Sequence, residues 1–253
     1  MKKHLYGFVG LGMAILAGTM AAEETGPSPS LDAQPQTAEW AADWWMPRHE
    51  AKLQEVRDRA RIDLVMIGDS ITQGWENTGR GNPAWDMRPV WKEYYAHRYA
   101  LNLGFSGDRT EHVLWRLRNG EVEGLSPKLV TVMIGTNNLN VKRAPEGTAA
   151  GVLAIVEEVR VRMPEAKVLL LGVFPRGEQP DDPFRPEIAT INDTLRQRAD
   201  DETVWYLDIG PRLLDSDGVL PKTLAPDELH PNAKGYRIWA ETMEPTVAEL
   251  LGE

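Results

Sequence analysis

The sequence predicts an α/β fold with a five-stranded parallel sheet covered by helices on both faces. Five short runs rich in apolar and β-branched residues recur along the chain, and several are apolar throughout rather than alternating. Strands of that kind are buried on both faces. Helical patterns lie between the runs, and such an alternation is typical of parallel sheets. With 253 residues, 42% of them hydrophobic, the chain can form one such domain around a sizeable core.

The chain is expected to begin with a secretory signal peptide over residues 1–22. Lys2 and Lys3 precede an apolar run over 5–18, and small residues at 19–22 offer a cleavage site. The run is shorter than the roughly 20 residues of a membrane-spanning helix, although an uncleaved anchor is an alternative. Residues 23–38 are rich in Pro, Ser and acidic residues, which predicts a flexible linker. We therefore expect the folded domain over 39–253 and an exported, periplasmic or extracellular protein.

The predicted strands are, in chain order, 62–68, 100–105, 129–134, 167–174 and 203–209. Between 152 and 163, apolar residues recur every three or four positions, which predicts a helix that Pro164 ends. Asp108 is expected to cap another helix, because Glu111 follows it at the spacing of a capping box. A last helix is expected over 232–250.

The composition excludes several classes of function. A formal net charge of −10 argues against nucleic acid as a partner and against docking on anionic membranes, since both need basic surfaces. The chain has no cysteine, which excludes disulfides, a cysteine nucleophile and thiolate metal sites.

Ser70, in the stretch GDSIT, follows the first predicted strand directly. In open parallel sheets the functional crevice lies outside the carboxyl ends of the strands, so polar residues at these ends are the first candidates for chemistry. A serine hydroxyl at that place is either a helix N-cap or a nucleophile. A nucleophilic serine needs a base, an orienting acid and oxyanion donors elsewhere in the chain.

His230 is the best candidate for the base. Of the five histidines it alone lies in a loop, LAPDELHPN, between the fifth predicted strand and the last helix. Asp227 precedes it by three residues, so that a carboxylate can accept from Nδ1 while Nε2 stays free for the serine proton. A metal-binding Asp/His pair and a surface loop are the alternatives.

Oxyanion donors are expected after the second and third strands. Gly107 belongs to a tight turn, NLGFSGDR, where a backbone N–H can point into the crevice. Asn137 follows the third strand in MIGTNN, and its side-chain amide is a neutral donor. Each could be ordinary turn chemistry, but together the strand-end loops contain a complete set of catalytic residue types.

These four blocks, GDSIT, NLGFSGD, GTNN and DELH, resemble those of the SGNH hydrolase (GDSL esterase/lipase) superfamily in the same order. Residues 100–138 are also similar to the catalytic subunits of intracellular platelet-activating factor acetylhydrolase. The resemblance implies a flavodoxin-like three-layer α/β/α sandwich, no cofactor and no metal. It implies Ser70 as nucleophile, His230 as base and Asp227 as its orienting acid. The oxyanion hole would then consist of the N–H groups of Ser70 and Gly107 and the side chain of Asn137.

The substrate is predicted to be a short-chain, acetyl-type ester, with O-acetyl groups on a carbohydrate favoured. An insertion behind Ser70 carries Trp75, Trp85 and Trp91, whose rings either stack on sugars or pack in the core. Asp69 and Arg109 are further candidates for substrate contact. A lysophospholipase or thioesterase, a metal-dependent hydrolase and an inactive glycan-binding module are the alternatives. No stable membrane insertion is expected after removal of the leader, and the sequence does not specify an oligomeric state.

Overall fold

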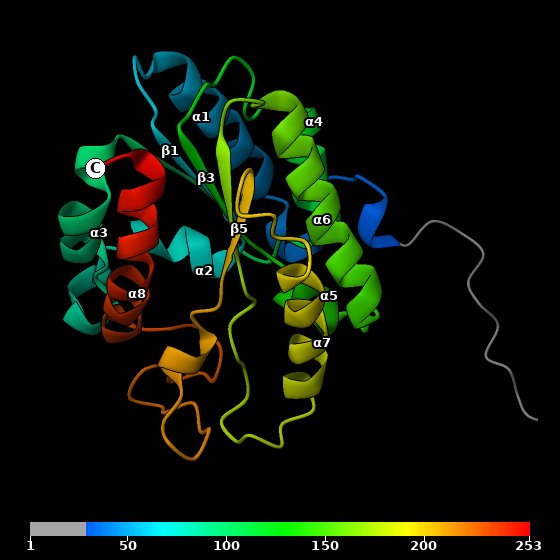
Figure 1. Ribbon diagram of the computed structural model, residues 1–253, viewed down its shortest axis with the longest axis vertical. Helices are drawn as coiled ribbons and strands as arrows, with labels where there is room; N and C mark the ends of the chain where they lie inside the picture. Colours follow the sequence, from blue (N-terminus) through cyan, green and yellow to red (C-terminus); the bar gives the residue numbers. More distant parts are fainter. Residues whose placement is uncertain (1–28) are drawn as a thin grey trace, which may run out of the picture.

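The structure is a computed structural model in which residues 29–253 are described. Its centre is a parallel sheet flanked by helices (Figure 1). The sheet has five strands in the order β2-β1-β3-β4-β5, which is the flavodoxin-like order. The strands are β1 (Leu64–Gly68), β2 (Ala100–Gly104), β3 (Leu129–Met133), β4 (Lys167–Leu171) and β5 (Val204–Leu207). The predicted five-stranded parallel sheet is confirmed, with each strand within the range expected from its apolar run.

Each inner strand contributes side chains to two separate cores because successive residues point to opposite faces of a sheet. In β1, Val65 and Ile67 belong to one hydrophobic cluster, whereas Leu64 and Met66 belong to the other. All five residues of β1 are buried, as are those of β2 and β3. This explains why these strands are apolar throughout rather than alternating.

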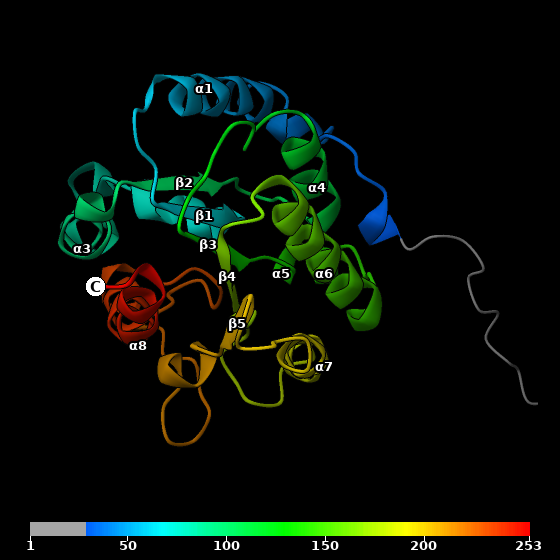
Figure 2. The same cartoon turned by 45° about the horizontal axis from the view of Figure 1, so that its top comes forward.

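Helices cover both faces of the sheet, giving three layers (Figure 2). The helices are α1 (Trp45–Asp58), α2 (Ser70–Gln73), α3 (Arg88–Tyr94), α4 (Thr110–Arg118), α5 (Thr136–Asn140), α6 (Pro145–Arg162), α7 (Phe184–Arg196) and α8 (Ala233–Leu251). α3 and α8 lie on one side, and α4, α6 and α7 lie on the other with α1 beside them. Asn232 caps α8 through its side chain, which accepts hydrogen bonds from Lys234 N–H and Gly235 N–H. The last helix is therefore where the sequence predicts it.

The segment before α1 is held against the domain from residue 29 onward. Thr110 Oγ1 donates to the carbonyl oxygen of Ser30 at 2.9 Å, and Gln34 N–H donates to the carbonyl oxygen of Glu111 at 3.2 Å. A short 3-10 turn, Pro29–Leu31, lies against α4 and α6. The flexible linker expected over 23–38 is thus corrected over 29–38, because hydrogen bonds with Thr110 and Glu111 of α4 hold this part. Residues 23–28 and the expected leader over 1–22 lie outside the described residues.

None of the helices in the described part of the chain is both long enough and apolar enough to cross a membrane.

Candidate active site

At the carboxyl ends of β1 and β2, helix α2 lies directly on the strand backbones. Gly68 and Gly104 are register partners at these ends. A Cβ atom on Gly104 would lie 2.1 Å from the backbone nitrogen of Gln73 in α2. One on Gly68 would lie 2.5 Å from the carbonyl oxygen of Met133 in β3. Only glycine permits this approach, so the two glycines determine where Ser70, the first residue of α2, lies in the crevice.

The hydroxyl of Ser70 is free for chemistry because its neighbour caps the helix. Asp69 is the N-cap residue of α2, and its carboxylate accepts a hydrogen bond from Ile71 N–H at 2.9 Å. Burial raises the pKa of Asp69 to about 6, and that hydrogen bond partly opposes the shift. Ser70 Oγ instead lies 2.9 Å from Nε2 of His230. The alternative of Ser70 as an N-cap is therefore excluded.

His230 connects Ser70 to Asp227 in the arrangement of a Ser–His–Asp triad. Its Nδ1 lies 2.6 Å from Oδ2 of Asp227, while Oδ1 accepts the backbone N–H of His230 at 2.7 Å. Partial burial would raise the pKa of Asp227, but the hydrogen bonds from His230 outweigh it and hold that pKa below its ordinary value. An ionised Asp227 favours the proton on Nδ1, which leaves Nε2 as the acceptor for the Ser70 proton.

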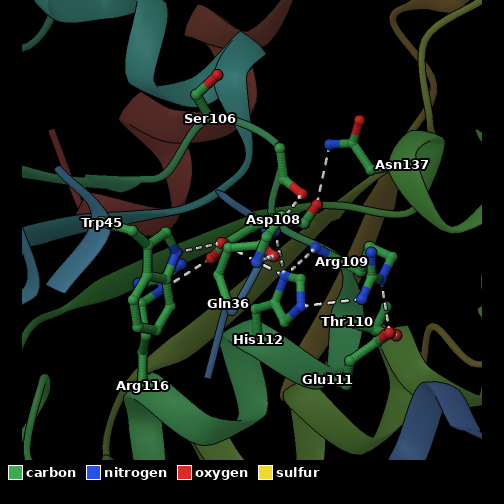
Figure 3. Close-up of polar contacts among 12 residues, drawn as sticks. Gln36, Trp45, Ser106, Asp108, Arg109, Thr110, Glu111, His112, Arg116 and Asn137 are labelled. Atoms are coloured by element: carbon green, nitrogen blue, oxygen red, sulfur yellow. Dashed lines mark hydrogen bonds and ion pairs between the residues drawn. The ribbon is translucent and has the colours of Figure 1, made fainter. Parts of the chain in front are cut away.

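Donors for an oxyanion lie at the ends of β1, β2 and β3. Gly107, in the turn after β2, has a φ of 72°, a conformation that favours glycine, and its N–H has no acceptor within residues 29–253. Asn137, in α5, donates one Nδ2 hydrogen to the carbonyl oxygen of Asp108 at 2.9 Å (Figure 3). Its second Nδ2 hydrogen is available, as is the N–H of Ser70 at the start of α2. All three expected donors therefore come from the loops predicted for them.

A buried ion cluster lies beside this turn and holds the residue to which Asn137 is bound. The fully buried carboxylate of Asp108 accepts from Trp45 Nε1 at 2.6 Å and from Arg116 Nε at 2.8 Å (Figure 3). Arg116, also fully buried, donates to the carboxylate of Glu121 as well. Burial raises the pKa of Asp108 to about 7, against the opposing effects of Arg116 and Trp45. The turn that carries Gly107 and Asp108, called the oxyanion turn below, is thus held in place by buried side chains.

The start of α4 is a correction to the sequence prediction. Arg109, not Asp108, is its N-cap residue, and its N–H donates to Nδ1 of His112 at 3.1 Å. The capping box expected from Asp108 and Glu111 is wrong because Arg116 and an indole bind the Asp108 carboxylate instead. Burial and the nearby arginines lower the pKa of His112 to about 3, so its ring is neutral and can accept this bond.

A cavity of about 260 Å³ opens beside Ser70. Its walls come from α2, the insertion behind it, the turn after β2 and the loop that carries the triad acid and base. The lining residues are Ser70, Gln73, Gly74, Asn77, Trp85, Ser106, Asp227, His230, Pro231 and Tyr236. Tyr236 also donates its hydroxyl to the carbonyl oxygen of Ile71, which joins α8 to α2.

The three tryptophans of the insertion have different roles. Trp85 is half-buried and lines the cavity. Trp75 is 1% exposed and packs edge-on against Tyr236 at 4.5 Å between ring centroids, so it is a core residue. Trp91, in α3, packs against Trp75 and Tyr95 and does not border the cavity. Of the three tryptophans, Trp85 alone lies where it could contact a substrate in the cavity. Trp75 and Trp91 pack in the core, as the alternative interpretation predicted.

Asp69 and Arg109, the other candidates for substrate contact, do not border this cavity. Asp69 is buried under the helix that it caps. Arg109 is turned toward α4, where its Nε lies 2.6 Å from Oε1 of Glu111 and its Nη2 lies 3.1 Å from Nε2 of His112 (Figure 3). Both side chains are engaged in local structure, and the contacts of the structure give no support to the prediction that they contact substrate.

Trp40 is a residue near the site that the sequence pattern did not indicate. It is 56% exposed, yet its indole covers Gly107 so closely that a Cβ there would lie 2.2 Å from the ring. Gln36, from the same segment, approaches the carbonyl oxygen of Gly107 at 3.5 Å. No motif marks these contacts, because they depend on how the N-terminal segment folds back over the turn.

In the described range 29–253, no group of three or more His, Asp or Glu side chains is placed to hold a metal ion.

Comparison with known proteins identifies relatives of this chain. The GDSL-like lipase/acylhydrolase family matches residues 66–238. The platelet-activating factor acetylhydrolase IB subunit alpha2 of rat is 34% identical over 212 residues, which cover 83% of this chain and 86% of the rat protein. The human alpha1 subunit is 34% identical over 210 residues, with coverage of 83% and 85%.

Solved structures share the fold at lower identity. A GDSL-like lipase from Bacteroides thetaiotaomicron has a TM-score of 0.62 at 19% identity, covering 79% of this chain and 97% of its own. An acetyl xylan esterase has a TM-score of 0.60 at 20% identity, with coverage of 74% and 100%. An acetylxylan esterase from Geobacillus stearothermophilus, solved as a catalytic mutant, has a TM-score of 0.56 at 20% identity, with coverage of 75% and 94%.

Proposed function

Because the chain belongs to the GDSL-like lipase/acylhydrolase family and is a carboxylic ester hydrolase, we propose that it removes short acyl groups, acetyl above all, from a carbohydrate. The observation that carries the proposal is the small cavity beside Ser70, lined mainly by polar side chains and by one half-buried tryptophan, Trp85. A short acyl group fits such a cavity, and an indole face can stack on a sugar ring.

The reaction follows from the positions of the triad atoms. Ser70 Oγ attacks the ester carbonyl carbon while Nε2 of His230, 2.9 Å away, takes the hydroxyl proton. The resulting oxyanion receives hydrogen bonds from the N–H groups of Ser70 and Gly107 and from Asn137 Nδ2.

The tetrahedral intermediate then collapses. The protonated His230 returns its proton to the leaving alcohol oxygen, and the acyl group stays on Ser70. A water molecule, deprotonated by His230, attacks the acyl-enzyme and releases the carboxylic acid, which restores the serine. Asp227 keeps the imidazole in the required tautomer and stabilises its charged form throughout.

The protein is also proposed to act outside the cytoplasm. The support is the basic, apolar and small-residue pattern of residues 1–22, which is the pattern of a cleaved leader.

A lipid acylhydrolase is the second candidate, favoured by the names of the relatives that are 34% identical. The polar lining beside Ser70 argues against a long acyl chain, since such a chain needs an apolar wall. An inactive binding module is disfavoured by the intact triad distances.

The test compares p-nitrophenyl acetate, butyrate and octanoate, and then acetylated xylooligosaccharides, with the wild type and with Ser70→Ala. We expect acetate to be the best of the three small esters, and all turnover to vanish in Ser70→Ala but to survive a chelator. Preference for octanoate would favour a long-chain lipid acylhydrolase, and hydrolysis of an acetylated phospholipid but not of the xylooligosaccharides would favour the lipid candidate that the relatives' names suggest. Activity that persists in Ser70→Ala would contradict the mechanism, and an inactive wild type would favour a binding module.

A further inference from the structure

A second cavity, of about 570 Å³, adjoins the one beside Ser70. The insertion behind α2 lines it, and Asn77 and Trp85 belong to both cavities. Trp85 therefore stands between them. A ligand whose ester lies at Ser70 can extend past this indole into the second cavity.

The walls of the second cavity are held in place by the loop's own contacts. The carbonyl oxygen of Asn77 accepts from Met87 N–H at 3.0 Å, and Thr78 forms an antiparallel bridge with Asp86. Met87 is fully buried. Within the loop, Asn82 accepts from Ala84 N–H through its side chain at 3.1 Å. The two ends of the loop, near Asn77 and Met87, are thus hydrogen-bonded to each other, which gives the cavity a defined shape.

Several side chains that line this cavity have unused hydrogen-bonding groups. The side chains of Asn77, Thr78 and Arg80 make no hydrogen bond or ion pair within residues 29–253. Arg80 has a φ of 44°, and it lies between Gly79 and Gly81, whose φ values of 70° and 93° are also positive. A left-handed conformation is disfavoured for arginine, and such outliers gather at ligand sites.

The lining of this cavity carries one carboxylate, Glu76, and one guanidinium, Arg80. Its one carboxylate, Glu76, is already bound by Arg48 at 2.9 Å and by Lys52 at 2.8 Å. The guanidinium of Arg80 is exposed and has no counter-ion among residues 29–253, in a chain with a formal net charge of −10. An anionic group on the ligand would supply the missing partner, and arginine binds carboxylates with two parallel hydrogen bonds.

We propose that the second cavity binds a neighbouring sugar of the same glycan chain and that Arg80 binds a carboxylate on it. The inference rests on the proposed function, which it narrows to O-acetylated acidic oligosaccharides. A phosphate on a lipid would present a similar charge to Arg80. The amides of Asn77 and Asn82 and the hydroxyl of Thr78 favour the glycan, because they match sugar hydroxyls rather than acyl chains.

The experiment measures kcat/KM for chemically acetylated oligogalacturonide trimers, which are acidic, and for acetylated xylotriose, which is neutral. We expect the wild type to prefer the acidic trimer. Arg80→Gln should reduce the ratio of the two kcat/KM values about tenfold, as loss of one charge-assisted contact implies. Arg88→Gln is the matched control, because Arg88 is exposed on the same segment but is already paired with Asp86. Its ratio should equal that of the wild type.

Each other outcome has one meaning. An unchanged ratio in Arg80→Gln, or a wild type without preference for the acidic trimer, would overturn the inference while turnover of p-nitrophenyl acetate left the esterase proposal intact. Faster turnover of an acetylated anionic phospholipid, lost in Arg80→Gln, would assign the cavity to a lipid headgroup and overturn the glycan. Failure of the wild type to hydrolyse any acetyl ester would overturn both proposals.

Discussion

Asp108→Asn tests whether the buried ion cluster holds the oxyanion turn. The carboxylate has two acceptor oxygens, one for Trp45 Nε1 and one for Arg116 Nε, and all three side chains are buried. An asparagine of the same shape offers one acceptor, and its amide hydrogens would face the other donor. That donor would lose its partner, and Arg116 would keep the Glu121 carboxylate and the carbonyl oxygen of Leu103. Leaving one partner of a buried pair without its counter-ion costs about 3–5 kcal/mol, and the burial that raises the pKa of Asp108 offsets part of this cost at pH 8, because asparagine carries no buried charge.

The same change is expected to reduce activity, because the carbonyl oxygen of Asp108 holds the side chain of Asn137. A shift of about 1 Å in a positioning group can cost on the order of 10²-fold in rate. The assay is urea unfolding followed by tryptophan fluorescence, together with kcat and KM for p-nitrophenyl acetate. Both are measured at pH 8, where Asp108 is ionised, since its pKa is about 7.

The control is Asp193→Asn, which removes the same charge from an exposed pair with Arg196. Its cost should stay below about 1 kcal/mol, as for surface pairs in general. If Asp108→Asn unfolds within about 1 kcal/mol of the wild type, as the control does, the reasoning about the buried carboxylate is refuted.

Further variants test single contacts of the site. Asn137→Ala should lower kcat by about 10²–10³-fold with little change in KM. The control Asn119→Ala, at an exposed position, should leave kcat unchanged. A loss of kcat below tenfold in Asn137→Ala would contradict its oxyanion role. Asp69→Asn should gain stability relative to the wild type between pH 4 and pH 7, by up to about 3 kcal/mol in urea unfolding. The reason is that burial raises the folded pKa of Asp69 to about 6, so the wild type loses stability as pH rises toward that value, and a pH-independent difference would exclude this. Trp75→Ala should lower the free energy of unfolding by about 3–5 kcal/mol. Trp85→Ala should lower it less and should instead raise KM for acetylated oligosaccharides. Equal losses of unfolding free energy would contradict the assignment of Trp75 to the core and of Trp85 to the cavity.

Much of the site could be predicted because its residues lie in short sequence motifs at the ends of the strands. Ser70, Gly107 and Asn137 each follow an apolar strand within a few residues, and parallel strands bring their carboxyl ends together whatever the intervening helices contain. Asp227 and His230 share one turn, so their hydrogen bond needs only the spacing of three residues.

The remaining features depend on contacts between distant segments. The carboxylate of Asp108 looks like a helix cap in sequence, but its partner Trp45 lies 63 residues earlier in the chain. The sequence alone does not show whether Trp75 or Trp85 is buried in the core. Trp75 is a core residue because Tyr236 and Trp239 of α8 enclose it, and no local pattern records that contact.

The bare glycine ends of β1 and β2 have a consequence for engineering this enzyme. Because Gly68 and Gly104 leave no room for a methyl group, substitution of either glycine should yield an inactive protein. The loop over 77–86 lies outside the sheet and is mostly exposed, so its side chains can change without moving Ser70. Libraries aimed at new substrates should therefore vary that loop, where catalytic geometry and selectivity are physically uncoupled.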